Sequence, residues 1–291
     1  MKAVPRPALK LRKITEIAGC ASRFLSGFIF HIISHMIRVL KRYFIRRRPF
    51  PEEWQNLLNS SVPYYRFLPN QRKQELKRHM PVILEEKIFE GCGGLVMTEE
   101  KRVVIAAYAT ILILGEPAGY YPDLKAILLY PDDYVAPVHQ EDEHGFMTEG
   151  HESRSGESWD LGSIVLSWKD IQRDIHEPFN GRNLIFHEFA HQLDDRYGMS
   201  AGIGEDGRVY KPSEWNNLLA SEYRDLIRQA ELGRPSIFDP YGASHPAEFF
   251  SVATETFFED SHRMKREKPK LYELFRQFYK LDPASWLPWK G

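Results

Sequence analysis

The pentapeptide at 187–191, His-Glu-Phe-Ala-His, constrains the fold of this chain more than any other segment. Residues four apart share one face of a helix, so a helix here would direct His187 and His191 towards one point, with Glu188 beside it. Two neutral imidazoles at this spacing are typical of zinc sites, and the adjacent carboxylate can act as a general base on a water molecule. The pentapeptide therefore predicts a zinc-dependent hydrolase.

The neighbouring residues predict that this helix is mostly buried. Within the segment 183–194, Leu184, Ile185, Phe189 and Leu193 recur at helical spacing. Buried imidazoles and carboxylates need polar partners, and a metal ion supplies them. A surface helix that carries these side chains by coincidence would not have such apolar neighbours.

A third protein ligand has to come from another part of the chain. Metal sites that add a third histidine six residues after the second are excluded, because Tyr197 stands there. A glutamate from a later helix is the other common solution. Ser244 and Pro246 predict the cap and first turn of such a helix, which carries Glu248 and, two turns further, Glu255. From spacing alone, either glutamate could bind the metal while the other orients a histidine from outside.

These segments resemble the Mlc titration factor A family of zinc-dependent, gluzincin-like peptidases. That family's pattern is His-Glu-x-Ala-His-x-Leu-Asp followed by Tyr-x-x-x-x-Pro-Ala-Glu. The chain reads His-Glu-Phe-Ala-His-Gln-Leu-Asp at 187–194 and Tyr-Gly-Ala-Ser-His-Pro-Ala-Glu at 241–248, and the likeness covers about 50–291. The resemblance implies that the zinc ligands are His187, His191 and Glu248. It also implies that Glu188 is the catalytic glutamate and that Tyr241 stabilises the oxyanion.

The resemblance also implies an activity, a setting and a second partner. It implies aminopeptidase-like hydrolysis of peptide substrates, with one zinc ion per chain, in a bacterial cytoplasm. The family's namesake binds a glucose-responsive transcriptional repressor, so a repressor protein is a further expected partner. The alternative is a non-catalytic, zinc-containing regulatory binding protein. The presence of both Glu188 and Tyr241 disfavours that alternative, because a structural zinc site needs no base.

Two residues near the motifs have competing interpretations. A phenol at Tyr241 could donate a hydrogen bond to the developing oxyanion, or the ring could pack the turn onto the core. Asp194 follows His187 by seven residues on the same helix face. It could accept a hydrogen bond from a metal-bound imidazole or from the helix that carries the glutamate, or it could pair with an arginine near the helix end.

The segment 162–168, Gly-Ser-Ile-Val-Leu-Ser-Trp, predicts a short strand just before the metal helix. A strand at the edge of a sheet can hold an extended peptide through main-chain hydrogen bonds. We therefore expect substrate to pair with Ser163, Ile164, Val165 and Leu166. The alternative is an interior strand with no free edge.

The distribution of charge divides the chain into two regions. Residues 1–49 contain twelve Lys or Arg and one acid, whereas 50–291 contain 27 basic and 39 acidic residues, so the net charge of −1 hides a strong asymmetry. This predicts a basic N-terminal extension at 1–49 and a metallopeptidase domain at 50–291. The two cysteines, Cys20 and Cys92, imply no disulfide framework and fit the reducing cytoplasm.

The extension predicts an amphipathic helix at 23–44, where apolar residues recur at helical spacing opposite basic ones. Its longest charge-free stretch, 24–37, has 14 residues and is too short for a comfortable membrane span. A helix on an anionic membrane surface is expected, so the protein would be cytoplasmic with peripheral membrane association. The alternative is a helix that docks on the acidic domain. Direct nucleic-acid binding is not expected, because interleaved Ile and Phe suit lipid better.

The rest of the chain predicts an α+β fold. Helices are expected at 71–89, 98–114, 211–231, 246–258 and 270–279, a buried strand at 126–130, and a long polar loop at 140–159. Helices dominate and strands are few. The expected architecture is therefore a mainly helical, zincin-like metallopeptidase with a small sheet and a metal site in the cleft between two lobes.

Overall fold

A computed structural model describes residue 33 and residues 36–115, 119–132, 134–141, 147–154, 156–159 and 162–289, with backbone alone for 134–141, 147–154 and 156–159. The chain divides into two compact units, Met1–Arg48 and Pro49–Gly291. Most of the amphipathic helix predicted at 23–44 lies outside the described residues. The candidate metal centre lies wholly in the second unit.

In the first unit, residues 36–45 are helical. More than half of the surface of four apolar residues is exposed, and these follow the spacing of one helix face: Met36, Ile37, Leu40 and Phe44. Arg38, Lys41 and Arg42 lie on the other side of the helix by the same spacing. Within the described part of the chain, no helix is both long and apolar enough to cross a membrane.

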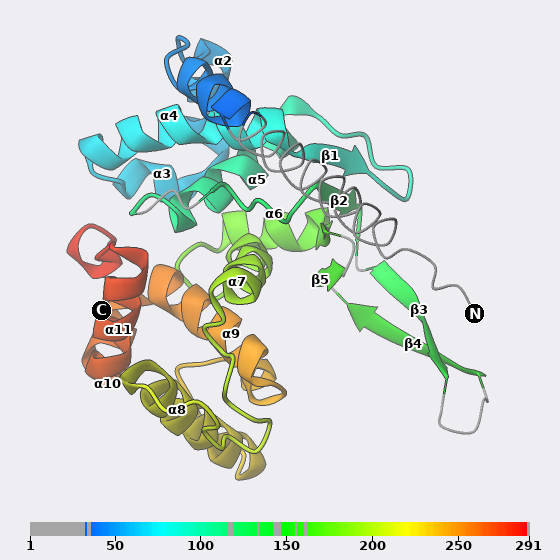
Figure 1. The fold of residues 1–291 in the computed structure, drawn as a ribbon, viewed down its shortest axis with the longest axis vertical. Helices are drawn as coiled ribbons and strands as arrows, with labels where there is room; N and C mark the ends of the chain where they lie inside the picture. Colours follow the sequence, from blue (N-terminus) through cyan, green and yellow to red (C-terminus); the bar gives the residue numbers. More distant parts are fainter. Residues whose placement is uncertain are drawn as a thin grey trace, which may run out of the picture. The chain divides into compact units, whose positions relative to one another are not determined.

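The second unit is mainly helical, as expected. Its helices are α2 (Glu52–Ser61), α3 (Pro63–Phe67), α4 (Asn70–Glu86), α5 (Glu99–Leu112), α6 (Trp168–His176), α7 (Leu184–Tyr197), α8 (Glu214–Glu231), α9 (Pro246–Glu259), α10 (Ser261–Glu267) and α11 (Pro269–Tyr279), with 3-10 turns η1 (Pro240–Ala243) and η2 (Pro283–Ser285). Figure 1 shows α7 between α2 to α5 on one side and α8 to α11 on the other.

A small sheet completes the α+β fold. Its strands are β1 (Ile88–Gly91), β2 (Ala126–Tyr130), β6 (Ser163–Ser167) and β5 (Gly156–Trp159), in that order; the first three are parallel and β5 is antiparallel to β6. In the register, Ile127 and Leu129 lie beside Ile164 and Leu166, and all four are fully buried. A separate antiparallel hairpin pairs β3 (Tyr134–Glu141) with β4 (Met147–Arg154).

Some predicted boundaries are wrong. The helix expected to reach residue 89 ends at Glu86, because the chain enters β1 two residues later. The loop expected at 140–159 instead contains all of β4 and β5. Polar strands of this kind lack the apolar alternation by which strands are recognised. The helix expected from residue 211 begins at Glu214, with the Ser213 hydroxyl accepting a hydrogen bond from the Asn216 amide at 2.9 Å.

An aromatic cluster fixes α7 in the core. The Phe186 ring is fully buried, and its centroid lies 5.2 Å from that of Tyr108 on α5 and 5.0 Å from that of Phe258 on α9. Phe189, one turn along, packs against Tyr121 at 4.8 Å. These rings hold the α7 backbone between α5 and α9, and so set where the adjacent His187 points.

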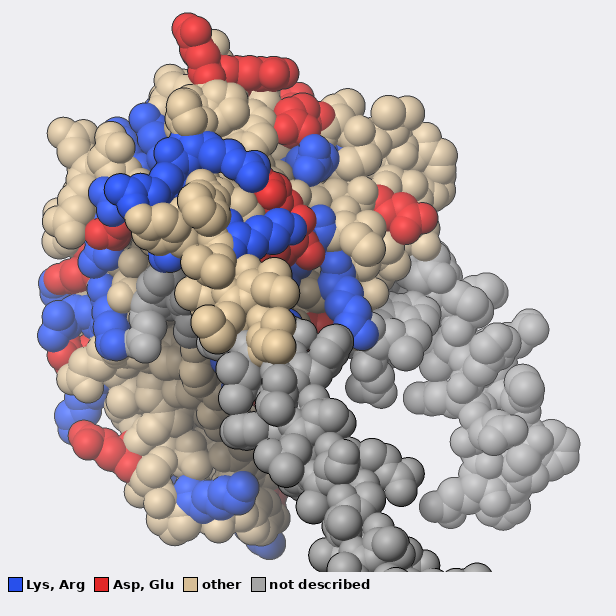
Figure 2. Space-filling model, turned by 45° about the horizontal axis from the view of Figure 1, so that its top comes forward, with Lys and Arg blue, Asp and Glu red and all other residues tan. Residues whose placement is uncertain are grey.

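Charge is mixed on the described surface. On the face drawn in Figure 2, Lys and Arg side chains are interspersed with Asp and Glu. On the described part of this face, neither sign of charge forms a continuous patch.

Candidate metal centre

Side-chain hydrogen bonds set the start and direction of α7. The Asn183 side chain caps the helix, accepting from the Phe186 amide at 3.0 Å, and the Asp174 carboxylate accepts from the Leu184 amide at 2.8 Å. At the other end, Gly198 adopts φ 64°, the left-handed conformation that glycine favours at a helix end. The helix is thus fixed at both termini, and the pentapeptide lies in its middle.

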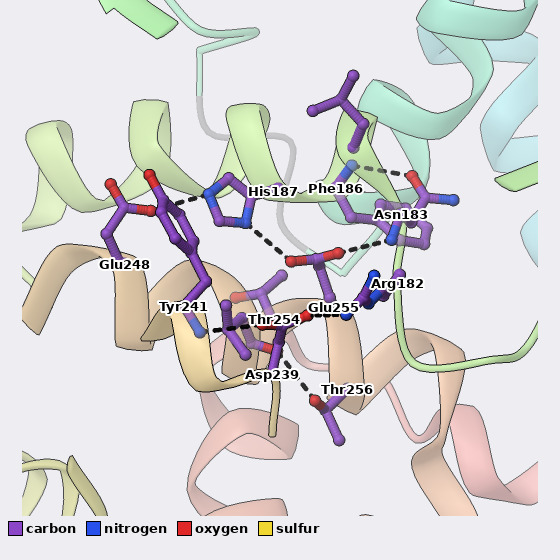
Figure 3. Close-up of polar contacts among 12 residues, drawn as sticks. Arg182, Asn183, Phe186, His187, Asp239, Tyr241, Glu248, Thr254, Glu255 and Thr256 are labelled. Carbon is purple, nitrogen blue, oxygen red and sulfur yellow. Dashed lines mark hydrogen bonds and ion pairs between the residues drawn. The ribbon is translucent and has the colours of Figure 1, made fainter. Parts of the chain in front are cut away.

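Three side chains converge from α7 and α9. His187 Nε2 lies 3.0 Å from Glu248 Oε2 and 3.2 Å from His191 Nε2, and His191 Nε2 lies 3.3 Å from the same carboxylate oxygen. Figure 3 shows Glu248 reaching across from α9 to His187. In the described part of the chain, no other set of three His, Cys, Asp or Glu side chains brings its ligand atoms together in this way.

These separations fit a zinc ion. A tetrahedral zinc ion, about 2.0–2.1 Å from each nitrogen or oxygen ligand, keeps its ligands about 3.3 Å apart. The three observed separations lie between 3.0 and 3.3 Å. Two imidazoles and one carboxylate are also a donor set typical of catalytic zinc, which keeps a fourth position open. The residues therefore fit the metal that the pentapeptide predicts.

Glu255 supports His187 from the opposite side of the ring. Its Oε1 lies 2.8 Å from His187 Nδ1, and its Oε2 accepts from the Asn183 amide at 2.6 Å. Figure 3 shows this carboxylate between His187 and Asn183. Nδ1 donates to Glu255, so Nε2 is left as the ligand atom. Of the two glutamates that spacing left open, Glu248 faces Nε2 and Glu255 faces Nδ1, which favours Glu248 as the third ligand.

The pKa of each ionisable group at the site depends on its charged neighbours. Burial alone would lower the pKa of His187, but its hydrogen bonds to Glu248 and Glu255 raise it well above its ordinary value. Burial would likewise raise the pKa of Glu248, yet hydrogen bonds to His187 and His191 hold it far below normal. The position between His187, His191 and Glu248 therefore favours a positive charge, and a metal cation competes with a proton for it.

Glu188 is a buried carboxyl next to the candidate metal ligands. The residue is 2% exposed, and among the described residues its Oε2 has no hydrogen-bond partner. Burial raises the pKa of this carboxyl, although the nearby His187 and His191 oppose the rise. A buried carboxylate with an unused oxygen beside a metal-ligand set is a group suited to proton transfer.

Tyr241 lies at the same site, on η1. Its ring centroid is 6.0 Å from that of His187, and 58% of the residue is exposed, so it does not serve mainly to pack the turn onto the core. The Asp239 carboxylate accepts from the Tyr241 amide at 2.9 Å and forms an ion pair with Arg182, in the loop before α7. This pair joins the Tyr241 turn to the metal helix (Figure 3).

The expectation that Ser163, Ile164, Val165 and Leu166 form a free edge is wrong. These residues do form a strand, β6, but it pairs with β2 on one side and β5 on the other. Their main-chain groups are therefore engaged within the sheet. The sequence could not indicate this, because the second neighbour comes from the polar segment at 156–159, which carries no strand signal.

Two further expectations are corrected by the hydrogen bonds. Asp194 contacts neither an imidazole nor an arginine among the described hydrogen bonds and ion pairs; its carboxylate accepts from the amide and hydroxyl of Ser200, which closes the turn after α7. The cap of α9 is His245, whose Nδ1 accepts from the Ala247 amide at 3.2 Å. Ser244 instead donates its hydroxyl to the Tyr241 carbonyl at 2.7 Å.

Glu259 is a structural part of the site that sequence reasoning missed. Its two oxygens accept from the Phe179 amide at 2.6 Å and the Asn183 side chain at 3.1 Å, and burial raises its pKa to about 8. Together with Glu255 it holds the segment that leads into α7. The signal was available, because Glu255 and Glu259 lie four apart on a helix rich in apolar residues.

Comparison with known proteins gives a consistent family assignment. The family model described as glucose-regulated metallo-peptidase M90 matches residues 36–280. An uncharacterized protein from Synechocystis is 41% identical over 240 residues, which are 81% of this chain and 86% of the relative. A protein named Mlc titration factor A from Serratia proteamaculans is 31% identical, over 80% of this chain and 88% of the relative. A protein of the same name from Yersinia pestis is 29% identical, over 80% of this chain and 86% of the relative.

Proposed function

Because this chain belongs to the glucose-regulated metallo-peptidase M90 family, we propose that it is a zinc-dependent peptidase with aminopeptidase-like action on peptides. One observation carries the proposal: the ligand atoms of His187, His191 and Glu248 lie within 3.3 Å of each other. The next residue after His187 is a buried carboxyl with an oxygen that has no described partner. A purely structural zinc site would not need this base.

In this proposal, each side chain has its own role in hydrolysis. When bound, zinc supplies Lewis acidity that lowers the pKa of water towards neutrality and polarises a carbonyl. Glu188 takes the proton of the attacking water and passes it to the leaving amine. Its burial supports this role, since a raised pKa favours a carboxyl that both accepts and returns a proton near neutral pH. Tyr241 donates a hydrogen bond to the developing oxyanion.

The peptide would bind along β5 rather than β6. In the described sheet, β5 has β6 on one side and no strand on the other, and its backbone lies close to α7. An extended peptide can add to such an edge through main-chain hydrogen bonds. The substrate would then cross the zinc site in a cleft between the two groups of helices that flank α7.

Hydrolysis of a panel of aminoacyl and peptide reporters tests the activity. The expected result is hydrolysis that a chelator abolishes and stoichiometric zinc restores. Faster cleavage of substrates with a free N-terminal amine than of their acetylated forms would support aminopeptidase action. Zinc binding with no hydrolysis of any reporter would favour the non-catalytic alternative, in which the zinc site serves a regulatory binding protein.

We further propose a cytoplasmic regulatory role in which the protein binds a transcriptional repressor. The names of two relatives, Mlc titration factor A, support this role. The test is co-purification of the chain with the repressors of its own organism. Retention of one repressor by both the parent and a Glu188→Gln variant is expected, because binding does not need the base.

The exposed apolar face at 36–44 supports a third proposal, that the extension binds an anionic membrane surface. Met36, Ile37, Leu40 and Phe44 are more than half exposed, with basic residues opposite. Vesicles containing phosphatidylglycerol should co-sediment the full chain, and a Leu40→Asp/Phe44→Asp variant should stay in solution. Val96→Asp, at a residue 73% exposed in the other unit, is the matched control. Equal sedimentation of the double variant and the control would contradict membrane binding.

A further inference from the structure

A cavity of about 300 Å³ lies apart from the three metal-ligand residues, none of which lines it. Its walls come from the segment before α7, the turn from α9 into α10, and the C-terminal residues 287–289. Ligand cavities in proteins typically span about 300–1,000 Å³. This cavity is therefore large enough for one small molecule.

Two arginines on one face of α10 give the cavity an anion-binding character. Arg263 and Arg266 both line it, and they share one close partner, Glu267 Oε1, at 3.2 and 2.9 Å. The contact of Arg263 with Asp260, at 3.9 Å, is too long for a hydrogen bond. Each guanidinium carries five N–H donors, so the shared carboxylate leaves donor capacity on both. An anion with several oxygens can use that capacity.

Ser261 adds an independent sign of a ligand. The residue lines the cavity and is 2% exposed, and among the described residues its hydroxyl has no hydrogen-bond partner. Buried hydroxyls in native proteins nearly always have such a partner. A polar atom of a bound molecule would supply it.

The rim of the cavity offers a flat apolar surface. Trp289 is 62% exposed, and its ring lies 5.4 Å from that of His262, with Leu287 and Pro288 next to it. Exposed indole faces readily stack on planar rings. Glu259, on the inner wall, points its oxygens at Phe179 and Asn183, and its pKa of about 8 leaves it mostly uncharged at neutral pH. Asp260 remains the one opposing acid of the lining.

We propose that this cavity binds a small aryl phosphate. The phosphate would sit between Arg263, Arg266 and the Ser261 hydroxyl, and the ring would stack on Trp289. Donors from three side chains suit a tetrahedral phosphate with several free oxygens better than a planar carboxylate. The proposal concerns a separate site and does not depend on hydrolysis at the metal centre.

Calorimetric titration of the full chain with phenyl phosphate tests the proposal. Since phosphates also bind zinc, the titration is done on the zinc-loaded protein and again with chelator present. With chelator present, saturable one-to-one binding is expected, about tenfold tighter than that of inorganic phosphate or benzoate, and the zinc-loaded protein should show the same event beside any binding to zinc. No saturable binding with chelator present would overturn the proposal, and so would equal affinity for all three probes.

Variants separate a ligand contact from a structural role. Ser261→Ala, Arg263→Gln and Trp289→Ala should each weaken phenyl phosphate at least tenfold. Arg228→Gln, on α8 and absent from the lining, should leave binding unchanged. Because the Ser261 hydroxyl has no described protein partner, Ser261→Ala should not lower the Tm. Parental affinity in all three lining variants would overturn the proposal.

Discussion

His187 Nδ1 lies 2.8 Å from Glu255 Oε1, while the opposite ring nitrogen faces Glu248 at 3.0 Å. One imidazole is thus held between two carboxylates of α9 that are two helical turns apart. Glu248 belongs to the candidate ligand set, and Glu255 holds the ring from its opposite side. Metal affinity should therefore depend on a residue that does not touch the metal.

Replacing Glu255 by Gln tests that dependence. The amide oxygen can still accept from His187 Nδ1, but the negative charge that raises the basicity of the ring is lost, and so is the hydrogen bond that the second carboxylate oxygen accepts from the Asn183 amide. Zinc affinity should fall about tenfold to a hundredfold, as is typical for loss of such an outer partner. Competition with a chelating dye measures this directly. Glu231→Gln, at the exposed end of α8, is the control, and parental zinc affinity in Glu255→Gln would contradict the role.

Tyr241→Phe isolates the phenol hydroxyl. Loss of one oxyanion donor typically lowers kcat about a hundredfold to a thousandfold. The ring, and hence its packing near His187, is kept, so zinc content and KM should change little. Steady-state kinetics with the best peptide reporter gives both parameters. A variant with unchanged kcat would remove Tyr241 from the chemistry.

The raised pKa of Glu259 predicts that the stability of the protein depends on pH. Burial raises its pKa from an ordinary 4.5 to about 8 in the folded protein. Between these pH values the unfolded chain has released a proton that the folded protein still holds. The free energy of unfolding should therefore fall through this group as pH rises from about 5 to about 8. Glu259→Gln should make this fall shallower.

Urea unfolding of the metal-free protein at several pH values measures this slope. Chelator is present throughout, because zinc binding is itself pH-dependent. Glu231→Gln again serves as the control, since its carboxylate is exposed on α8. Identical slopes for Glu259→Gln and this control would show that Glu259 titrates normally.

The aromatic anchor of α7 can be tested by truncation. Phe186 is fully buried against Tyr108 and Phe258, so Phe186→Ala should lower the free energy of unfolding by about 3–5 kcal/mol. Phe67→Ala, at a ring that is 38% exposed, should cost clearly less. Denaturant titration of the two variants compares them. Equal losses would mean that packing around Phe186 does not set the position of the metal helix.

The convergence of His187, His191 and Glu248 was predictable because these residues follow the periodicity of two helices. Histidines four apart, and acids in the first turns of a later helix, follow directly from helical periodicity. Spacing alone could not choose between Glu248 and Glu255, since both lie on the face of α9 that meets α7. The choice depends on the point along α7 at which α9 crosses it, and tertiary packing sets that point.

Partners that are remote in sequence were not predictable. The apolar run of β6 identified a strand, but its neighbours are set by sheet pairing with β2 and the polar β5. Asp194 has the right helical phase for the metal face, yet the turn after Gly198 brings Ser200 to it first. In both cases a long-range or turn contact decided between two locally equivalent roles.

The most direct test of the zinc peptidase assignment is the Glu188→Gln variant, with metal content and hydrolysis measured on the same sample. Gln keeps the shape of the side chain but cannot take a proton from water. The expected result is one zinc ion per chain, as in the parent, with peptide hydrolysis reduced by at least a hundredfold. Parental hydrolysis by the zinc-loaded variant would contradict the assignment of Glu188 as the base.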